Sequence, residues 1–365
     1  MNIVIFSPNL KAKTGSPIRA FNIINGLYNY GVNYNIILVS SDFEDGLLER
    51  YQCYNINDHN GIEKALKSAV QENNADVLFC ITHGYTNIIS NVARYFKIPF
   101  FVDIHGIRTL EILEERTDLI TKIKNIYDCL PWFFGIMKAT KIFCANPRLY
   151  DWLKLFFRNK VIDVCGITDI SKFKFIQKDR DFINVLYAGN FNSYQGVELL
   201  LDAIKIILDD DPVFKFYIAG NNNIVDDSLK KKILELKKYK NFFFIPPIDY
   251  NEYPNFLGKM DVFIIPRKPS ITAYMAFPQK IIESMSSGKC VIATNLSPHK
   301  TALTNPDCGI LCNPNPNSIA NAIIKTKDKY LRRDLGKAAR KKALEKYDLS
   351  VQIPKIIKNI EDNTV

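Results

Sequence analysis

Short apolar runs alternate with longer segments of helical periodicity along most of this 365-residue chain. The runs cover residues 3–6, 35–39, 76–81, 99–103 and 141–144 in the first half, and residues 183–187, 214–218, 241–245, 261–265 and 289–293 in the second. The helical segments between them include residues 18–30, 197–208, 228–238, 253–259 and 278–287. Strands that alternate with helices in this way favour parallel sheets with helices on both faces.

The two series of strands predict two doubly wound α/β domains. We place the boundary in the polar stretch 168–181, which gives an N-terminal domain of residues 1–168 and a C-terminal domain of residues 169–346. The lysine-rich tail, residues 318–363, is expected to be wholly helical, with residues 347–365 as a closing helix. Ligands of open parallel sheets bind beyond the carboxyl ends of the strands, so the functional residues are expected just after strands.

The composition is that of a globular protein, with 47% hydrophobic and 24% charged residues. The chain contains no run of about eighteen or more apolar residues and begins directly with strand-like sequence. We therefore expect neither a spanning helix nor a secretion signal. The eight cysteines are scattered without a CxxC pair, which favours reduced thiols in a cytoplasmic protein over a zinc site.

The formal net charge is +10, and the basic surplus lies in the second half, mainly at residues 230–240 and 325–346. An anionic ligand, an anionic membrane surface or a nucleic acid would each account for such a surplus, as would solvated lysine-rich helix faces. The sequence has no helix-turn-helix, zinc-finger or aromatic-basic RNA-binding pattern. We therefore expect no nucleic-acid partner.

Residues 277–294 have the pattern of a loop, a helix and a buried strand. Pro278 suits the first helical turn, and Gly288 suits the position just past the helix end. Lys280 and Glu283 are three residues apart, so they share one face near the helix N-terminus, where free N–H groups favour an anion. A cation beside a carboxylate suits a nucleoside diphosphate, with the phosphates near Lys280 and the ribose hydroxyls near Glu283.

Two further strand-end loops in the second half carry candidate phosphate ligands. The loop after residues 183–187 contains Gly189, Asn190, Gln195 and Gly196, where backbone N–H groups can cradle phosphate. Arg267 follows residues 261–265, and its guanidinium can bind phosphate in a bidentate manner. An ordinary βα loop and a solvent-facing arginine are the structural alternatives.

In the first half, the loop after the first strand contains Gly15, Ser16 and Arg19. It lacks the GxGxxG pattern, which disfavours an NAD enzyme. A helix that begins at Gly15 and Ser16 could bind an anion or sugar hydroxyls. His83 and His105 follow two predicted strands, where side chains face the expected cleft, and structural histidines are the alternative.

These residues together resemble the retaining nucleotide-sugar glycosyltransferases of the GT-B fold, family 4, also called glycosyl transferases group 1. The most specific likeness lies in two motifs, Pro278-x-Lys280-x-x-Glu283 followed by Gly288, and Ala188-Gly189-Asn190 followed by Gln195-Gly196. Met275 stands where the commoner pattern has a first glutamate, and Asn190 and Gln195 replace an arginine and a lysine. This variant is similar to members that build surface polysaccharides of the bacterial type.

The resemblance implies an α/β GT-B fold, with two doubly wound Rossmann-like domains facing across a cleft. The first domain would bind the acceptor and the second the nucleotide sugar, and the closing helix would return to the first domain. The implied roles are as follows: catalysis by His105, Lys280 and Arg267; donor binding by Gly15, Gly189, Asn190, Gln195, Gly196, Ile248, Pro278 and Glu283; acceptor binding by Ser16, Arg19 and His83. No metal or other cofactor is expected.

The implied partners are a nucleotide-diphosphate sugar and a glycan or lipid-linked acceptor, in the cytoplasm or at the inner face of the cell membrane. Residues 130–138 and 152–158 mix bulky apolar and basic side chains, so they either contact a bilayer or pack as helices on the sheet. Three other classes compete: an epimerase-like nucleotide-sugar protein, a phosphorylase and a non-catalytic two-lobed binding protein. A phosphorylase would need a longer chain and a pyridoxal-phosphate lysine.

Overall fold

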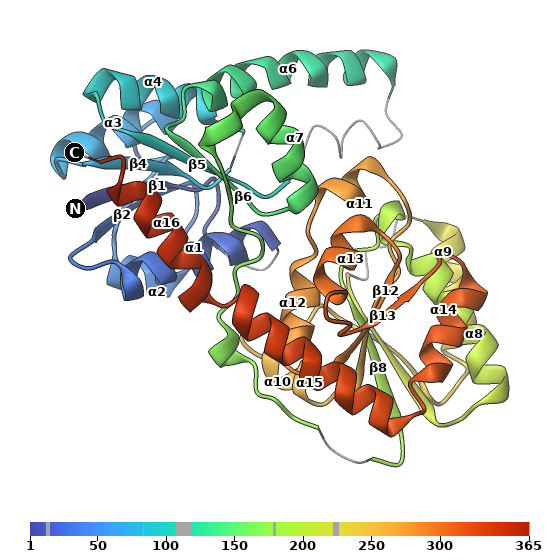
Figure 1. Cartoon of the computed structure of the whole chain (residues 1–365). Coiled ribbons are helices and arrows are strands. Elements are labelled where there is room, and N and C mark those ends of the chain that lie inside the picture. The colour runs from blue at the N-terminus through green and yellow to red at the C-terminus, as the bar shows by residue number, and fades with distance from the viewer. Residues whose placement is uncertain (12–14, 83, 107–117, 178–179, 222–225, 365) are drawn as a thin grey trace. The chain divides into compact units, whose positions relative to one another are not determined.

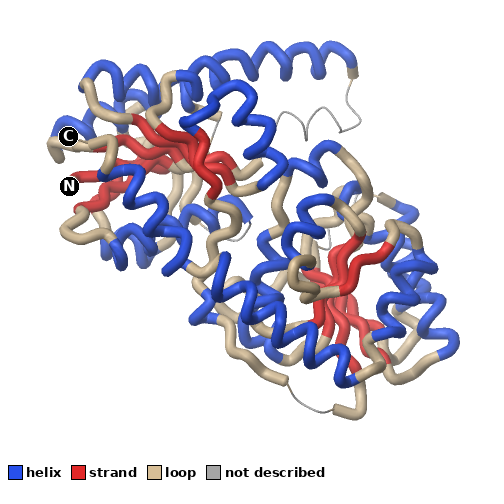
Figure 2. The backbone as a smooth tube through the Cα atoms, viewed as in Figure 1, coloured by secondary structure: helices blue, strands red, loops and turns tan. Residues whose placement is uncertain are grey.

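The computed structural model describes residues 1–364 except 12–14, 83, 107–117, 178–179 and 222–225. Contacts divide the chain into two compact units. The first contains Met1–Thr168, Met275–Phe277 and Asp348–Val365, and the second contains Asp169–Tyr274 and Pro278–Tyr347. Figure 1 shows helices on both faces of the sheet in each unit, and Figure 2 shows the strands of each unit in one central layer.

The first unit is built on a seven-stranded parallel sheet of order β3-β2-β1-β4-β5-β6-β7. Its strands are β1 (Asn2–Phe6), β2 (Asn35–Ser40), β3 (Gln52–Asn55), β4 (Val77–Cys80), β5 (Phe100–Ile104), β6 (Lys141–Cys144) and β7 (Val161–Asp163). Its helices are α1 (Gly15–Tyr30), α2 (Asp45–Arg50), α3 (Ile62–Glu72), α4 (Thr86–Phe96), α6 (Leu119–Met137), α7 (Pro147–Phe157) and α16 (Leu349–Glu361). Chain order reverses between β1 and β4, which makes this pair the switch point of the sheet.

The second unit is built on a six-stranded parallel sheet of order β10-β9-β8-β11-β12-β13. Its strands are β8 (Ile183–Ala188), β9 (Phe214–Ala219), β10 (Phe242–Ile245), β11 (Val262–Ile265), β12 (Cys290–Thr294) and β13 (Ile310–Cys312). Its helices are α8 (Val197–Asp210), α9 (Asp227–Leu236), α10 (Tyr253–Gly258), α12 (Gln279–Ser286), α13 (Ser297–Leu303), α14 (Pro316–Lys325) and α15 (Lys329–Lys346). Helix α11 (Ile271–Met275) ends in the first unit, and the switch point lies between β8 and β11.

Alternate residues of β1 face two separate cores. Val4 and Phe6 join one apolar cluster with α3, α4, α6 and α7, while Ile3 and Ile5 join another with α1 and α16. Burial on both faces explains why the strand has a continuous apolar run. The two doubly wound Rossmann-like α/β domains predicted from the sequence are confirmed.

Local differences from the predicted elements have physical reasons. The tail is not wholly helical, because Asp328 and Asp348 each cap the start of a new helix with their side chains, so α14, α15 and α16 are separate. Pro278 precedes α12 as its N-cap and does not lie within the first turn. Gly288 has a positive φ of 65° just past α12, as predicted for a helix end.

Helix α16 packs along α1 in the first unit. A Cβ on Gly26 would lie 2.3 Å from Cγ1 of Ile353, so only a glycine permits this approach. Leu349, Ile356 and Ile360 are buried in the same core cluster. The last helix therefore completes one face of the first unit, although it follows the second unit in the chain.

Candidate functional site

The switch point of the second sheet is formed by two loops that contact one another. The backbone N–H of Lys268, after β11, donates to the carbonyl of Tyr194, after β8, at 2.9 Å. Gly196 has a φ of 68°, and a Cβ there would lie 2.0 Å from the carbonyl oxygen of Pro266. The close approach of the two loops therefore requires glycine at this position.

This contact brings together two residues that the sequence assigned to the phosphate site. The Nε of Arg267 donates to Oε1 of Gln195 at 3.2 Å. The guanidinium carbon also lies 5.8 Å from the ring centroid of Tyr194. Arg267 is largely buried, at 8% exposure, so its cation is held in one place at the carboxyl end of β11.

Helix α12 brings Lys280 and Glu283 to the same edge of the sheet. It precedes the parallel strand β12, so its N-terminus lies at the carboxyl edge. Nζ of Lys280 lies 3.8 Å from Oε2 of Glu283 and 4.1 Å from the ring centroid of Tyr253. The helical face predicted from their spacing is therefore present.

The carboxylate of Glu283 is buried, at 1% exposure, and accepts no hydrogen bond from any residue that the structure describes. Burial raises its pKa, and the nearby Lys280 offsets only part of that rise. Burial likewise raises the pKa of Tyr250 and of Tyr253, and the carboxylate adds to both shifts. A buried carboxylate without donors is costly, and this cost is relieved when a ligand supplies hydroxyl donors.

A hydrogen-bonded chain behind Arg267 was not foreseen from the sequence. Nδ1 of His299 lies 2.7 Å from the carbonyl of Thr294, to which it donates as Nδ1–H. The hydroxyl of Thr294 donates to the carbonyl of Arg267 at 2.6 Å. Burial and the Arg267 cation lower the pKa of His299 to about 3, so its ring is neutral. The only sequence signal was a histidine shortly after a buried strand.

The first unit holds a different pair at the end of β5. Arg19 of α1 is buried and binds both carboxylate oxygens of Asp103, at 2.8 and 2.7 Å, and also the carbonyl of Val164 at 3.0 Å. This ion pair overcomes the effect of burial and lowers the pKa of Asp103 to about 2. Nδ1 of His105 lies 3.5 Å from Oδ2 of Asp103. The guanidinium of Arg19 is therefore bound within the protein, to Asp103 and to the carbonyl of Val164.

The remaining residues that the sequence predicted for the site lie at element ends and in loops. Gly15 and Ser16 begin α1, Ile248 lies half-buried between β10 and α10, and His83 lies outside the described residues. The carbonyl of Asn190 accepts a hydrogen bond from the hydroxyl of Tyr187 at 2.5 Å, and the N–H of Gly189 donates to Ala219 at 3.1 Å. Sequence reasoning missed four residues around the second-unit cluster: Tyr250, Tyr253, Thr294 and His299.

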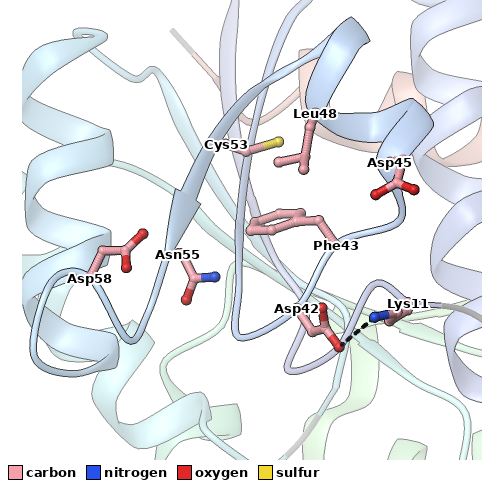
Figure 3. A pocket seen from close by; sticks show the side chains of 8 residues that line it. All are labelled: Lys11, Asp42, Phe43, Asp45, Leu48, Cys53, Asn55 and Asp58. Carbon is pink, nitrogen blue, oxygen red and sulfur yellow. Dashed lines mark ion pairs between the residues drawn. The ribbon is translucent and has the colours of Figure 1, made fainter.

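An open depression of about 440 Å³ lies elsewhere in the first unit, beside α2 and β3 (Figure 3). Lys11 and Asp42 form an ion pair at its rim, with 3.9 Å between Nζ and Oδ2. The lining residues are Lys11, Asp42, Phe43, Asp45, Leu48, Cys53, Asn55 and Asp58. This set includes none of the residues predicted for the site, so the depression does not enter the functional argument.

The described part of the chain contains neither a metal-binding cluster nor a helix that could cross a membrane. No group of three or more His, Cys, Asp or Glu side chains within it is arranged to hold a metal ion. Among its helices, none combines the length and the apolar character needed to cross a membrane.

Most of the second unit matches a known protein family. Residues 169–342 match the family Glycosyl transferases group 1. The matched region contains the loops around Gln195 and Arg267 as well as helix α12. The glycosyl transferases group 1 region therefore includes the whole cluster of second-unit residues described above.

Further similarities involve more of the chain than this family match. An uncharacterized glycosyltransferase of Methanocaldococcus jannaschii is 24% identical over 245 residues, which is 66% of this chain and 62% of the relative. HepE of Anabaena, solved with UDP and glucose, has a TM-score of 0.76 at 15% identity, covering 99% of this chain and all of the other. WaaG, a glycosyltransferase involved in lipopolysaccharide biosynthesis, has a TM-score of 0.73 at 12% identity, covering 98% and 99%. These structures share the GT-B fold with this chain.

Proposed function

We propose that this protein is a glycosyltransferase that takes its sugar from a nucleoside-diphosphate donor bound at the carboxyl edge of the second unit. The observation that carries the proposal is the buried Glu283 carboxylate, which lacks a hydrogen-bond donor among the described residues and lies beside the Lys280 cation. The match of residues 169–342 to glycosyl transferases group 1 supports it. So does the likeness of the fold to HepE, which has been solved with UDP-glucose.

In this proposal each part of the donor meets a matching group. The ribose hydroxyls donate to the two oxygens of Glu283, which removes the cost of burying that carboxylate without partners. The diphosphate lies against Lys280, Arg267 and the loop of residues 189–196, in which the N–H groups of Gly189, Gln195 and Gly196 already donate to carbonyls of the protein. Ile248 and its neighbours lie near the base, because they follow β10 at the same edge of the sheet.

We further propose that transfer occurs with retention of the anomeric configuration. The acceptor hydroxyl oxygen forms a bond to the anomeric carbon as the bond from that carbon to the phosphate oxygen breaks. The acceptor proton passes to the departing phosphate, so no protein nucleophile is needed. Lys280 and Arg267 stabilise the negative charge that develops on the leaving group. No metal takes part, and turnover is expected to persist in EDTA.

The acceptor is proposed to be a glycan or a lipid-linked glycan in the synthesis of a surface polysaccharide or glycoconjugate. The likeness to WaaG supports this assignment. Residues 1–168 are proposed to bind the acceptor, and His105, Ser16 and His83 stay predictions for that unit. A His105→Ala variant that keeps its nucleotide affinity but loses turnover would support its role.

The test is calorimetric titration of the full chain with UDP, GDP, ADP and dTDP. One nucleoside diphosphate is expected to bind, and Glu283→Gln is expected to weaken it by about 2 kcal/mol, or roughly thirtyfold. Glu345→Gln, which changes an exposed carboxylate on α15, serves as the matched control. The corresponding nucleotide sugar is then incubated with glycan acceptors, and the anomeric configuration of the product is read by NMR.

Two results would reject the proposal. Equal affinity in the wild type and Glu283→Gln would mean that the carboxylate is structural. Conversion of the sugar nucleotide to an epimer without any acceptor would instead support the epimerase-like alternative.

A further inference from the structure

Helix α6 carries a row of exposed apolar side chains along one face. Their spacing of three and four residues keeps them on one side of the helix. The row consists of Ile120, Ile123, Tyr127, Leu130, Phe134 and Met137, each at least 47% exposed. Exposed apolar surface of this extent marks a contact with another molecule or with a membrane, and not a solvated helix face.

A second exposed apolar group lies on α7 and is linked to the row through the half-buried ring of Phe133, whose centroid lies 6.5 Å from that of Phe134. Leu155 and Phe156 are 76% and 56% exposed, and the ring of Phe156 lies 6.0 Å from that of Phe133 on α6. We call Phe134, Met137, Leu155 and Phe156 the α6–α7 patch. It spans two helices, so it is broader than the single seam of a coiled coil.

The patch is held rigidly by the opposite faces of both helices. A Cβ on Gly135 would lie 2.3 Å from the backbone of Thr86, so α6 packs directly on α4. The hydroxyl of Thr86 donates to the carbonyl of Trp132 at 2.7 Å, and Ile136 is fully buried. On α7, Leu153 is buried in the same core. Neither helix can turn its exposed side chains inward without breaking these contacts.

Basic side chains surround the patch. Lys138, Lys154 and Arg158 are exposed at its edges, and Lys124 is exposed farther along α6. The exposed acidic residues on these elements whose side chains are described are Asp118, at the far end of α6, and Asp151. Apolar and aromatic side chains rimmed by cations suit an anionic lipid surface, where the rings enter the interface and the cations meet the headgroups.

A second copy of the chain fits this surface less well. In a two-fold symmetric contact the same patch meets itself, so Lys138, Lys154 and Arg158 would lie close to their own counterparts. Like charges brought together in this way oppose association. An anionic bilayer has the opposite charge and no such conflict.

We propose that the α6–α7 patch docks the protein onto an anionic lipid surface. The proposal rests on the first unit alone and does not depend on the nucleotide chemistry of the second. Under this proposal, each of the two alternatives for residues 130–138 and 152–158 applies to some of their side chains. Trp132, Ile136, Leu153 and Phe157 pack inward, while the exposed side chains between them contact the bilayer.

The test is co-flotation of the full chain with vesicles of phosphatidylcholine, with or without phosphatidylglycerol. We expect binding only to the anionic vesicles, and weaker binding as salt is raised. Lys154→Gln/Arg158→Gln is expected to lower the partition coefficient about thirtyfold, and Phe134→Gln/Leu155→Gln at least about tenfold. The matched controls change exposed residues of the second unit, Lys231→Gln/Lys337→Gln and Leu234→Gln/Tyr330→Gln.

Each outcome of this test either supports or overturns the docking surface. Loss of binding in both patch variants but in neither control supports the docking surface, provided that their thermal midpoints match the wild type. Absence of binding to anionic vesicles, or equal loss in the controls, overturns it. Dimers that sedimentation detects in the wild type and that Phe134→Gln/Leu155→Gln dissociates would assign the patch to a second copy and also overturn it. Nucleotide titration of the same variants reports separately on the proposed function.

Discussion

Each unit has a cation–carboxylate pair with a buried carboxylate at the carboxyl edge of a parallel sheet, but the two carboxylates differ in how many hydrogen bonds they accept. Arg19 meets both oxygens of Asp103 at hydrogen-bond distance, and the pKa of that carboxyl falls to about 2. Lys280 stops 3.8 Å from Glu283, whose pKa rises. The first pair is complete within the protein, whereas the second leaves acceptor capacity for a ligand.

The difference follows from side-chain shape and position. A guanidinium has a planar fork that fits a carboxylate, and both side chains of the Arg19–Asp103 pair are buried between α1 and β5. An ammonium is a compact point charge without such a fork, and Nζ of Lys280 lies near both the Glu283 carboxylate and the Tyr253 ring. A complete pair fixes a structure, and an incomplete one in a polar site favours ligand binding. The following predictions test this contrast.

The largest effect is expected when the cation of each pair is removed. Arg19→Met leaves a buried carboxylate without its partner and is expected to lower the free energy of unfolding by about 3–5 kcal/mol. Lys280→Met should cost about 1 kcal/mol or less, because Lys280 is partly exposed and Glu283 can take up a proton. Urea denaturation at neutral pH measures both.

A double variant sharpens this result. Arg19→Met/Asp103→Leu removes both charges and is expected to recover most of the stability that Arg19→Met loses. If Arg19→Met and Lys280→Met were equally destabilised, the two ion pairs would contribute equally to the fold. The contrast between a complete and an incomplete pair would then be wrong.

Isosteric amides test the carboxylates themselves. Asp103→Asn is expected to cost about 2–3 kcal/mol of unfolding free energy, because the buried guanidinium loses its charged partner. Glu283→Gln should be neutral or slightly stabilising without nucleotide, since the buried charge that it removes has no donor among the described residues. A large loss of stability in Glu283→Gln would show that this carboxylate serves the fold.

The two carboxyls should also respond to pH with opposite signs. Asp103 has a pKa lowered to about 2 in the fold, so its contribution of about 2 kcal/mol is present above pH 4 and is lost between about pH 4 and 2. Glu283 has a raised pKa, so its ionisation costs stability, and the cost disappears as pH falls through that value. The two contributions can be separated by measuring the free energy of unfolding as a function of pH. The proteins compared are the wild type, Asp103→Asn and Glu283→Gln.

The sequence predicted the central strands well and missed three edge strands. Strands such as β1, β4 and β12 are covered by helices on both faces, so their sequences are continuous apolar runs. Strands β3, β7 and β13 lie at sheet edges and are three or four residues long, with partly exposed side chains. Their pairing depends on a neighbouring strand and leaves little pattern in the local sequence.

In the candidate site, too, contacts between residues far apart in the sequence could not be predicted. Lys280 and Glu283 could be paired from spacing alone, because residues three positions apart on a helix lie on the same face. Arg267 and Gln195 were each predicted, but they are 72 residues apart, and only the fold shows their contact. Arg19 and Asp103 are 84 residues apart, so no local pattern indicated that the guanidinium is already bound.

The smallest expected effect concerns the support of Arg267 by His299. The neutral ring has a pKa lowered to about 3, so below pH 6.5 the unfolded chain binds a proton that the fold excludes. Between pH 6.5 and 5.5 the free energy of unfolding should therefore fall by about 1 kcal/mol through His299 alone. His299→Asn keeps a side-chain donor for the carbonyl of Thr294 and cannot titrate, so this part of the pH dependence should vanish.

Nucleotide affinity then separates support of Arg267 from support of the fold. Thr294→Val removes the hydrogen bond to the carbonyl of Arg267 and should weaken nucleoside-diphosphate binding by about 1 kcal/mol, whereas Thr294→Ser should retain it. His299→Asn should bind nucleotide as the wild type does at neutral pH. If Thr294→Val lost stability but kept full affinity, the chain behind Arg267 would serve only the fold. Nucleotide binding would then depend on Lys280 and Glu283, without a contribution from the hydrogen bonds of Thr294 and His299.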